Sequence, residues 1–186
     1  MSIDHLATSA RRSPVQIALL AGLVLVLIAT ASILLAGRTQ AVHGGLIHGP
    51  IMARAPFADA TAVQLRGLVA GKMNVSNANN VGETIIQQIT VDPGGFTGWH
   101  THPGPVVVLV ESGTFDVYQA NDPTCTAYSY GPNAAFIDPG QGNVHSARNN
   151  SLTEPMVAWA VYFDVPADLM SPFIPVQDPG DSCADF

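Results

Sequence analysis

Short runs of β-branched and other apolar residues, each ended by glycine or proline, recur between residues 62 and 163. Residues 85–91 and 106–110 are two such runs, and a turn that begins at Asp92 ends the first of them. Many short strands joined by turns at regular spacing are typical of a β-sandwich or a β-barrel. No segment of the sequence repeats, so we expect an all-β fold with one barrel, over residues 61–186.

Three histidines follow glycine-containing turns in this strand-rich region. His100 and His102 are two residues apart, and side chains two apart on a strand point to the same face. Such a pair can hold one metal ion from one wall of a barrel. His145 follows a second turn, at residues 140–144. A lone His-x-His pair is weak support for a metal site, but the third histidine in a similar setting strengthens it.

The first histidine pair resembles a signature motif of the cupins, which are small β-barrels of the jelly-roll or double-stranded β-helix type. That motif reads G-x5-H-x-H-x3-or-4-E-x6-G, and this chain supplies Gly94, His100, His102 and Gly113 at the required spacing. The glutamate position holds Val106 instead.

The third histidine lies in a segment that resembles the second cupin motif, P-x-G-x2-H-x3-N. Gly142, His145 and Asn149 keep the spacing, while Gly140 stands where the motif has proline. The resemblance covers residues 81–163, and it implies a single cupin-type barrel.

The resemblance also implies a divalent metal ion held by His100, His102 and His145. Three neutral imidazoles add no charge, so the ion would keep its full charge and attract anionic ligands. Without the glutamate, the donor set favours Fe, Cu, Ni or Zn over Mn and Mg. Some three-histidine cupins are iron dioxygenases, and the resemblance implies a metal-dependent oxidoreductase of that class.

Other side chains around this site are assigned by strand alternation and by turn chemistry. Glu111 is expected to point away from the site, because Val106 and its alternate neighbours share the inward face. Asp138 precedes a Pro-Gly turn and is expected to cap that turn. Four residues are expected to line an apolar pocket: Val106, Trp99, Phe136 and Trp159.

An uncharged apolar run from Ile17 to Ala36 lies near the N-terminus. In a helix, at about 1.5 Å per residue, it would span about 30 Å, the thickness of a bilayer's hydrocarbon core. We therefore expect a transmembrane signal-anchor or uncleaved signal peptide over residues 15–37. A signal peptide cleaved near Ala29-Thr30-Ala31, giving a secreted protein, is the alternative.

Arg11 and Arg12 precede that run, so residues 1–14 are expected in the cytoplasm and the residues from about 40 onward outside it. Residues 38–60 have turn formers without a sustained period and are expected to be a linker. The expected location is a single-pass membrane protein with an extracytoplasmic C-terminal domain.

Cys125 and Cys183 are the two cysteines of the chain. An isolated pair in an exported protein is expected to form one disulfide, which would pin the C-terminal tail to the barrel. Asp and Glu outnumber Lys and Arg by 14 to 7, for a net charge of −7, and Lys72 is the only lysine. This balance argues against nucleic-acid binding, which needs a basic surface.

The sequence leaves three functions open. The first is a membrane-tethered metal-binding cupin that acts on or binds a small molecule, with dioxygenation as the implied chemistry. The second is a non-catalytic binding or sensing cupin without an essential metal, and the third is a structural domain of the cell envelope. The resemblance also implies a homodimer, and the alanine- and glycine-rich, lysine-poor composition favours a bacterial source.

Overall fold

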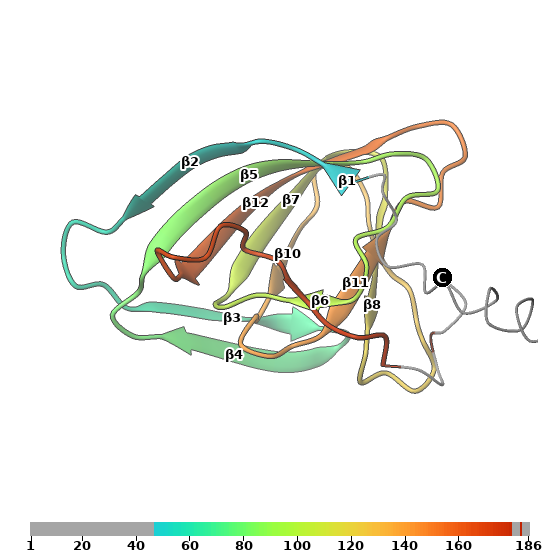
Figure 1. The fold of residues 1–186 in the computed structure, drawn as a ribbon. Helices are drawn as coiled ribbons and strands as arrows, with labels where there is room; N and C mark the ends of the chain where they lie inside the picture. The colour runs from blue at the N-terminus through green and yellow to red at the C-terminus, as the bar shows by residue number, and fades with distance from the viewer. Residues whose placement is uncertain (1–46, 180–182, 184–186) are drawn as a thin grey trace, which may run out of the picture. The chain divides into compact units, whose positions relative to one another are not determined.

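The computed structural model describes residues 47–179 and 183, which form two facing β-sheets and a separate hairpin (Figure 1). The predicted cytoplasmic segment, residues 1–14, and the predicted transmembrane segment, residues 15–37, lie outside the described residues. In the part of the chain that is described, no helix is long and apolar enough to cross a membrane. The all-β prediction is confirmed for these residues.

The larger sheet has six antiparallel strands in the order β1-β5-β12-β7-β10, with β2 also paired to β5. Its strands are β1 (Ile47–His48), β2 (Ile51–Pro56), β5 (Glu83–Val91), β7 (Val106–Ser112), β10 (Ala135–Asp138) and β12 (Met156–Val165).

The second sheet has five antiparallel strands in the order β13-β6-β11-β8-β9. They are β6 (His100–Thr101), β8 (Phe115–Gln119), β9 (Tyr128–Tyr130), β11 (His145–Arg148) and β13 (Ile174–Pro175). The hairpin consists of β3 (Val63–Val69) and β4 (Lys72–Ala78), which pair along their whole length.

The core lies between the two larger sheets, and strand alternation selects its residues. Along β12, every second side chain from Met156 to Tyr162 is buried, and the alternate ones are partly exposed. Val106, Val108 and Val110 bury the same face of β7, as the sequence predicted. The opposite sheet contributes Phe115, Val117 and Ala147 to the same cluster.

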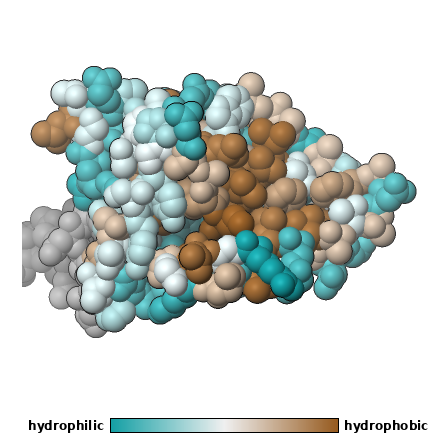
Figure 2. All heavy atoms as spheres, turned by 180° about the vertical axis from the view of Figure 1, so that it is seen from behind, coloured by the Kyte–Doolittle hydropathy of each residue, from teal (hydrophilic) through white to brown (hydrophobic). Residues whose placement is uncertain are grey.

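Apolar side chains also gather on the face of the domain seen from behind (Figure 2). The exposed large apolar residues of the domain include Leu68, Met73 and Val75 of the hairpin and Leu109 of β7. The homodimer implied by the resemblance remains a prediction.

The predicted linker, residues 38–60, is wrong for residues 47–56. These residues form β1 and β2, which both pair with β5 at the edge of the larger sheet. The linker was predicted from turn formers, but two of these, Gly49 and Pro50, only separate two short edge strands. Proline is tolerated at a sheet edge, so it does not exclude strands there. Gly49 has a φ of 152°, and a Cβ there would lie 1.7 Å from the carbonyl oxygen of Gln88 on β5.

The predicted disulfide is confirmed. Cys125 lies in the loop between β8 and β9, and it is bonded to Cys183 with a Cα–Cα distance of 5.4 Å. The bond joins two points 58 residues apart in the sequence. It links the C-terminal tail to the loop beside the second sheet, as predicted.

Candidate metal centre

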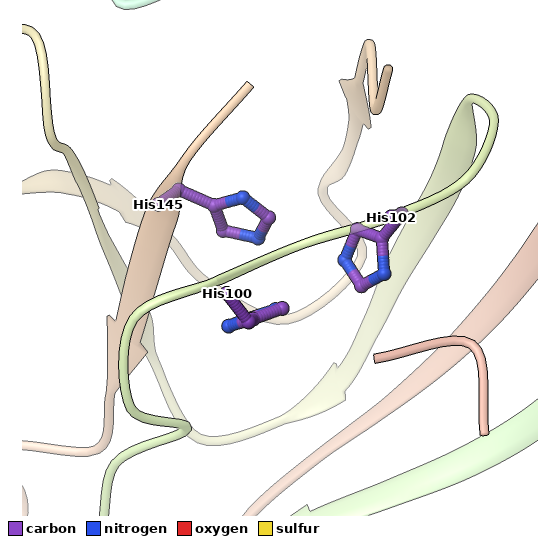
Figure 3. A group of neighbouring side chains, drawn as sticks. All are labelled: His100, His102 and His145. Carbon is purple, nitrogen blue, oxygen red and sulfur yellow. The ribbon is translucent and has the colours of Figure 1, made fainter. Parts of the chain in front are cut away.

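The three predicted histidines lie together on adjacent strands of the second sheet. His100 begins β6, His102 follows its last residue, and His145 begins β11. The antiparallel pairing of β6 with β11 places His145 directly across from His100. Figure 3 shows the three rings turned toward a shared space, with His145 on one strand and the other two on the neighbouring segment.

All three imidazoles are buried in the interior of the domain. Their relative exposures are 3% for His100, 3% for His102 and 5% for His145. One nitrogen from each ring can be chosen so that all three lie within 4.8 Å of one another. The His100 ring centroid is 4.3 Å from that of His145 and 4.8 Å from that of His102. The arrangement can hold one metal ion after a small inward movement of the rings, because two nitrogen ligands of one ion are at most about 4.2 Å apart.

Backbone carbonyl groups fix the tautomers of two of these histidines. Nδ1 of His100 is 2.9 Å from the carbonyl oxygen of Gly98, and Nδ1 of His102 is 2.8 Å from that of Pro172. A carbonyl oxygen only accepts, so each Nδ1 carries the hydrogen and each Nε2 keeps its lone pair. A metal-ligating histidine typically makes this kind of bond with its other nitrogen, which orients the ring.

Asp138 lies beside these histidines, where the sequence had predicted only a turn cap. Its Oδ2 is 3.7 Å from Nε2 of His102 and 3.7 Å from Nδ1 of His145. Oδ2 of Asp138 and Nδ1 of His145 are both buried and make no hydrogen bond. The other carboxylate oxygen, Oδ1, accepts a hydrogen bond from Nδ2 of Asn143 at 2.8 Å. The turn-cap prediction therefore missed a residue of the site.

Strand alternation in the sequence contains a signal that places Asp138 in the site. Phe136 was predicted to line the pocket, and Asp138 is two residues further along the same strand, β10. Side chains two apart on a strand share a face, so the pocket prediction for one implies the same face for the other. The proline and glycine after Asp138 hid this relationship.

A close backbone contact holds the turn after Asp138 against the loop after His102. Gly140 has a φ of 59°, and a Cβ there would lie 1.9 Å from the carbonyl oxygen of Gly104. Only glycine fits this contact, which explains why the chain has glycine where the cupin motif has proline. Nearby, the backbone N–H of Gln141 donates to the carbonyl oxygen of His102 at 2.8 Å.

Burial keeps the three imidazoles neutral. It lowers the pKa of His102 from 6.5 to about 4, with a further lowering by His100, while Asp138 and the bond to Pro172 oppose the shift. Burial, and then His102, lowers the pKa of His145 to about 3. The pKa of His100 is also lowered well below 6.5, first by burial and then by His145. Neutral imidazoles are the form that binds metal.

Burial acts on Asp138 in the opposite direction. Desolvation raises the pKa of its carboxyl group, while His102 and the hydrogen bond from Asn143 partly offset that rise. Desolvation also raises the pKa of the neighbouring Tyr162, and the charge of Asp138 adds to that rise. A positive charge in the site would stabilise the Asp138 carboxylate.

The cavity at the histidines is small and mostly apolar. It offers about 20 Å³ to the centre of a water molecule, which is room for one or two waters. Val106 and Phe136 line it, as predicted, and Tyr162 and Phe173 line it as well. The Phe173 ring lies 4.6 Å from the His100 ring, so the C-terminal segment covers the site.

The two tryptophans of the predicted pocket do not line this cavity. Trp159 lies on the partly exposed face of β12, where its Nε1 donates to Oε2 of Glu111 at 2.6 Å. Ala158 and Ala160 occupy the inward positions of that strand, so the large side chain is left on the outer face. Trp99 is buried, but it precedes His100 and is not part of the cavity wall. Glu111 points away from the site, as predicted.

The residues present fit a divalent transition metal. They offer three neutral imidazoles, two of them with Nε2 lone pairs fixed by backbone bonds, and one buried carboxylate oxygen without a partner. Imidazole is a ligand for Zn, Cu, Fe and Ni. Three histidine ligands also leave coordination positions open, which is typical of catalytic or ligand-binding sites.

No protein-family model matches this sequence, and no curated protein matches it. Among solved structures, KdgF from Halomonas sp. is similar at 17% identity and a TM-score of 0.44, over 69% of this chain and 87% of that one. A cupin-like protein from Thermotoga maritima is similar at 19% identity and a TM-score of 0.41, over 54% of this chain and 70% of that one.

A Klebsiella pneumoniae protein with a double-stranded β-helix domain is similar at 22% identity and a TM-score of 0.37. That match covers 45% of this chain and 70% of the other. All three TM-scores are below 0.5. The two facing antiparallel sheets and the three converging histidines on the motif spacing make the described domain cupin-like.

Proposed function

We propose that the protein binds one divalent transition-metal ion through His100, His102 and His145, and that this ion binds a small molecule. One observation carries the proposal. The Nδ1 atoms of His100 and His102 are bonded to backbone carbonyl groups, so both Nε2 lone pairs are available in the same buried space. A buried lone pair without a partner is unfavourable, and a metal ion would satisfy all three imidazoles at once.

The ion we propose is Fe, Cu, Ni or Zn, in keeping with the imidazole donors. When bound, such an ion supplies an electrophilic centre, and iron or copper can also activate oxygen. Metal-dependent dioxygenation is therefore the reaction class that we propose if the protein is an enzyme. The carbonyl groups of Gly98 and Pro172 would orient the two histidine rings that hold the ion. Phe173, which lines the cavity, would exclude bulk water.

A non-catalytic binding or sensing role is the second candidate, and the size of the cavity favours it. About 20 Å³ holds a water-sized ligand, so a larger substrate would have to displace Phe173. Asp138 is the one carboxylate among the described residues that line the cavity, which limits acid–base chemistry there. In this role the site would hold a ligand without turning it over.

We also propose that the domain is extracytoplasmic and tethered by residues 15–37, with a cleaved, secreted form as the alternative. The apolar run within that segment supports a membrane anchor. The disulfide between Cys125 and Cys183 supports an oxidising compartment, because such bonds persist outside the reducing cytoplasm.

Elemental analysis of the full-length protein, purified in detergent, tests the metal proposal. We expect near-stoichiometric Fe, Cu, Ni or Zn in the wild type and its loss in a His100→Ala, His102→Ala double variant. A His48→Ala variant is the matched control, because His48 is exposed and lies on β1. A wild type that binds no metal after reconstitution, with its fold intact, would contradict the proposal.

Two further measurements separate the candidate roles. Substrate-dependent oxygen uptake by the metal-loaded protein supports a dioxygenase. A ligand-induced rise in melting temperature without turnover supports the binding role. Both measurements use the His100→Ala, His102→Ala variant as the blank.

A further inference from the structure

The first cupin motif would place a carboxylate at residue 106. This chain has a carboxylate directly opposite that position, on the neighbouring strand of the same sheet. β7 and β10 are antiparallel neighbours, and their register pairs Val106 with Asp138. Side chains directly opposite each other on one face of such a pair have Cβ atoms about 4.5–5.5 Å apart. Val106 is 1% exposed and Asp138 is 4% exposed, and both line the same cavity. A carboxylate at residue 138 therefore reaches the space that a side chain at residue 106 would occupy.

The two oxygens of Asp138 are in different situations. Oδ1 is anchored by Nδ2 of Asn143 at 2.8 Å, and Asn143 also donates to Oε1 of Gln119 at 3.0 Å. This contact fixes the orientation of the carboxylate. Oδ2 is buried and has no hydrogen-bond donor, although a buried carboxylate oxygen is normally satisfied. The unsatisfied oxygen is the one that faces the histidines.

Oδ2 of Asp138 also faces another acceptor. Nδ1 of His102 is already used in the bond to Pro172, so the Nε2 atom that lies 3.7 Å from Oδ2 presents a lone pair. Two acceptors that face each other repel unless a proton or a metal ion lies between them. Two ligand atoms that are each about 2.1 Å from one metal ion are at most about 4.2 Å apart. The 3.7 Å separation lies within that limit.

We propose that Asp138 is a fourth ligand of the metal ion, so that the site has three histidines and one carboxylate although Val106 has replaced the motif glutamate. This inference rests on the proposed function, because it needs an ion at the histidines. The carboxylate lowers the net charge of a divalent site from +2 to +1. It also adds a hard oxygen donor, which shifts the preference back toward Fe and Mn.

The test uses the full-length protein and its Asp138→Asn variant. Both are depleted of metal and titrated with Co²⁺, and the absorption spectrum of the bound ion is recorded. We expect Asp138→Asn to weaken Co²⁺ binding by more than about 100-fold, because loss of an outer-shell partner alone typically costs about 10–100-fold. We also expect a changed spectrum, since the donor set of the ion changes. Unchanged affinity and spectrum would overturn the proposal.

Asp116→Asn is the matched control. Asp116 is another buried carboxylate, and it accepts hydrogen bonds from Ser129 and Asn150, away from the cavity lining. The Asp116→Asn variant should bind Co²⁺ with the wild-type spectrum even if its domain is less stable. If Asp116→Asn changes the Co²⁺ spectrum as much as Asp138→Asn does, the assignment of the ligand to Asp138 is wrong.

A second variant covers the case in which Asp138→Asn does not fold. The double substitution Val106→Glu, Asp138→Val moves the carboxylate across the strand pair and keeps the buried charge. We expect it to fold by circular dichroism and to bind Co²⁺ within about tenfold of wild type, which corresponds to about 1.4 kcal/mol. A folded double variant that does not bind Co²⁺ would count against the interchange of the two positions. Wild-type protein that binds no metal would instead contradict the proposed function itself.

Discussion

Nδ1 of His102 donates a hydrogen bond to the carbonyl oxygen of Pro172, 2.8 Å away and 70 residues further along the chain. The bond makes the C-terminal segment part of the metal centre, because it sets which nitrogen of His102 faces the cavity. Pro172 is among the most deeply buried residues of the domain, and the next residue, Phe173, packs against two of the histidine rings.

Phe173→Ala should expose the metal centre to solvent. The ring is partly buried against the core cluster, so we expect a loss of about 1–2 kcal/mol in the free energy of unfolding. We also expect faster loss of metal to a chelator, because the cavity becomes open to water. Urea denaturation and a stopped-flow chelator assay measure the two effects. Ile174→Ala is the control, since Ile174 is 37% exposed, and it should leave the chelation rate unchanged.

Replacing Cys125 and Cys183 with serine should destabilise the domain. For a loop of 58 residues, the chain-entropy model gives a loss of about 4 kcal/mol in the free energy of unfolding. This value is an upper estimate of the loss. Urea denaturation of the oxidised wild type and of the double variant gives the difference. A free-thiol assay of unreduced wild type should find none. Equal stability of the two proteins would mean that the bond does not constrain the unfolded chain.

The fold and three of the four polar site residues could be predicted from the sequence for a simple physical reason. Strand alternation depends only on local spacing, so His100 and His102 were assigned to one face without any knowledge of pairing. Asp138 could not be paired with Val106 in this way. The two residues lie opposite each other only because β10 pairs with β7. These strands are about 30 residues apart in the sequence, and no local pattern encodes their pairing.

The other errors also come from tertiary packing. Trp159 was assigned inward because it is large and apolar, yet the alternation of β12 buries alanines on the inner face. Residues 47–56 looked like a linker because their partner, β5, lies about 35 residues later. Phe173 lies beyond both motifs, and only the return of the tail across β6 brings it to the histidines.

The metal-free protein should lose stability as the pH falls below about 6.5. Burial lowers the pKa of His102 to about 4 and that of His145 to about 3, whereas the unfolded chain titrates near 6.5. Between these values the unfolded chain binds protons that the folded chain does not. Each such histidine lowers the free energy of unfolding by about 1.4 kcal/mol per pH unit. The raised pKa of Asp138 acts in the opposite direction, but for one group only.

Urea denaturation of the metal-free protein at pH 7.5, 6.5 and 5.5 measures this dependence. His48→Ala should show the wild-type dependence, because His48 is exposed on β1. Stability that is constant or rises from pH 7.5 to pH 5.5 would contradict the assignment of neutral, buried histidines.

Asn149→Ala should be among the most damaging substitutions outside the site. Asn149 is 1% exposed, and its Nδ2 donates to the carbonyl oxygens of Val91 and Glu154, while its Oδ1 accepts from the N–H of Ser151. Truncation leaves buried carbonyl groups unsatisfied, so we expect a loss of about 2–4 kcal/mol. Thermal unfolding measures it. Asn121→Ala, an exposed loop position, is the control and should change little.

The bond from His102 to Pro172 also makes the tautomer of His102 depend on a segment that the ribosome adds 70 residues later. A ribosome releases His100 and His102 well before it reaches the residues that complete their surroundings. Until Pro172 is in place, its carbonyl oxygen cannot set which nitrogen of His102 carries the hydrogen. The donor set with a fixed His102 tautomer is therefore complete only when residues 172–175 lie across β6.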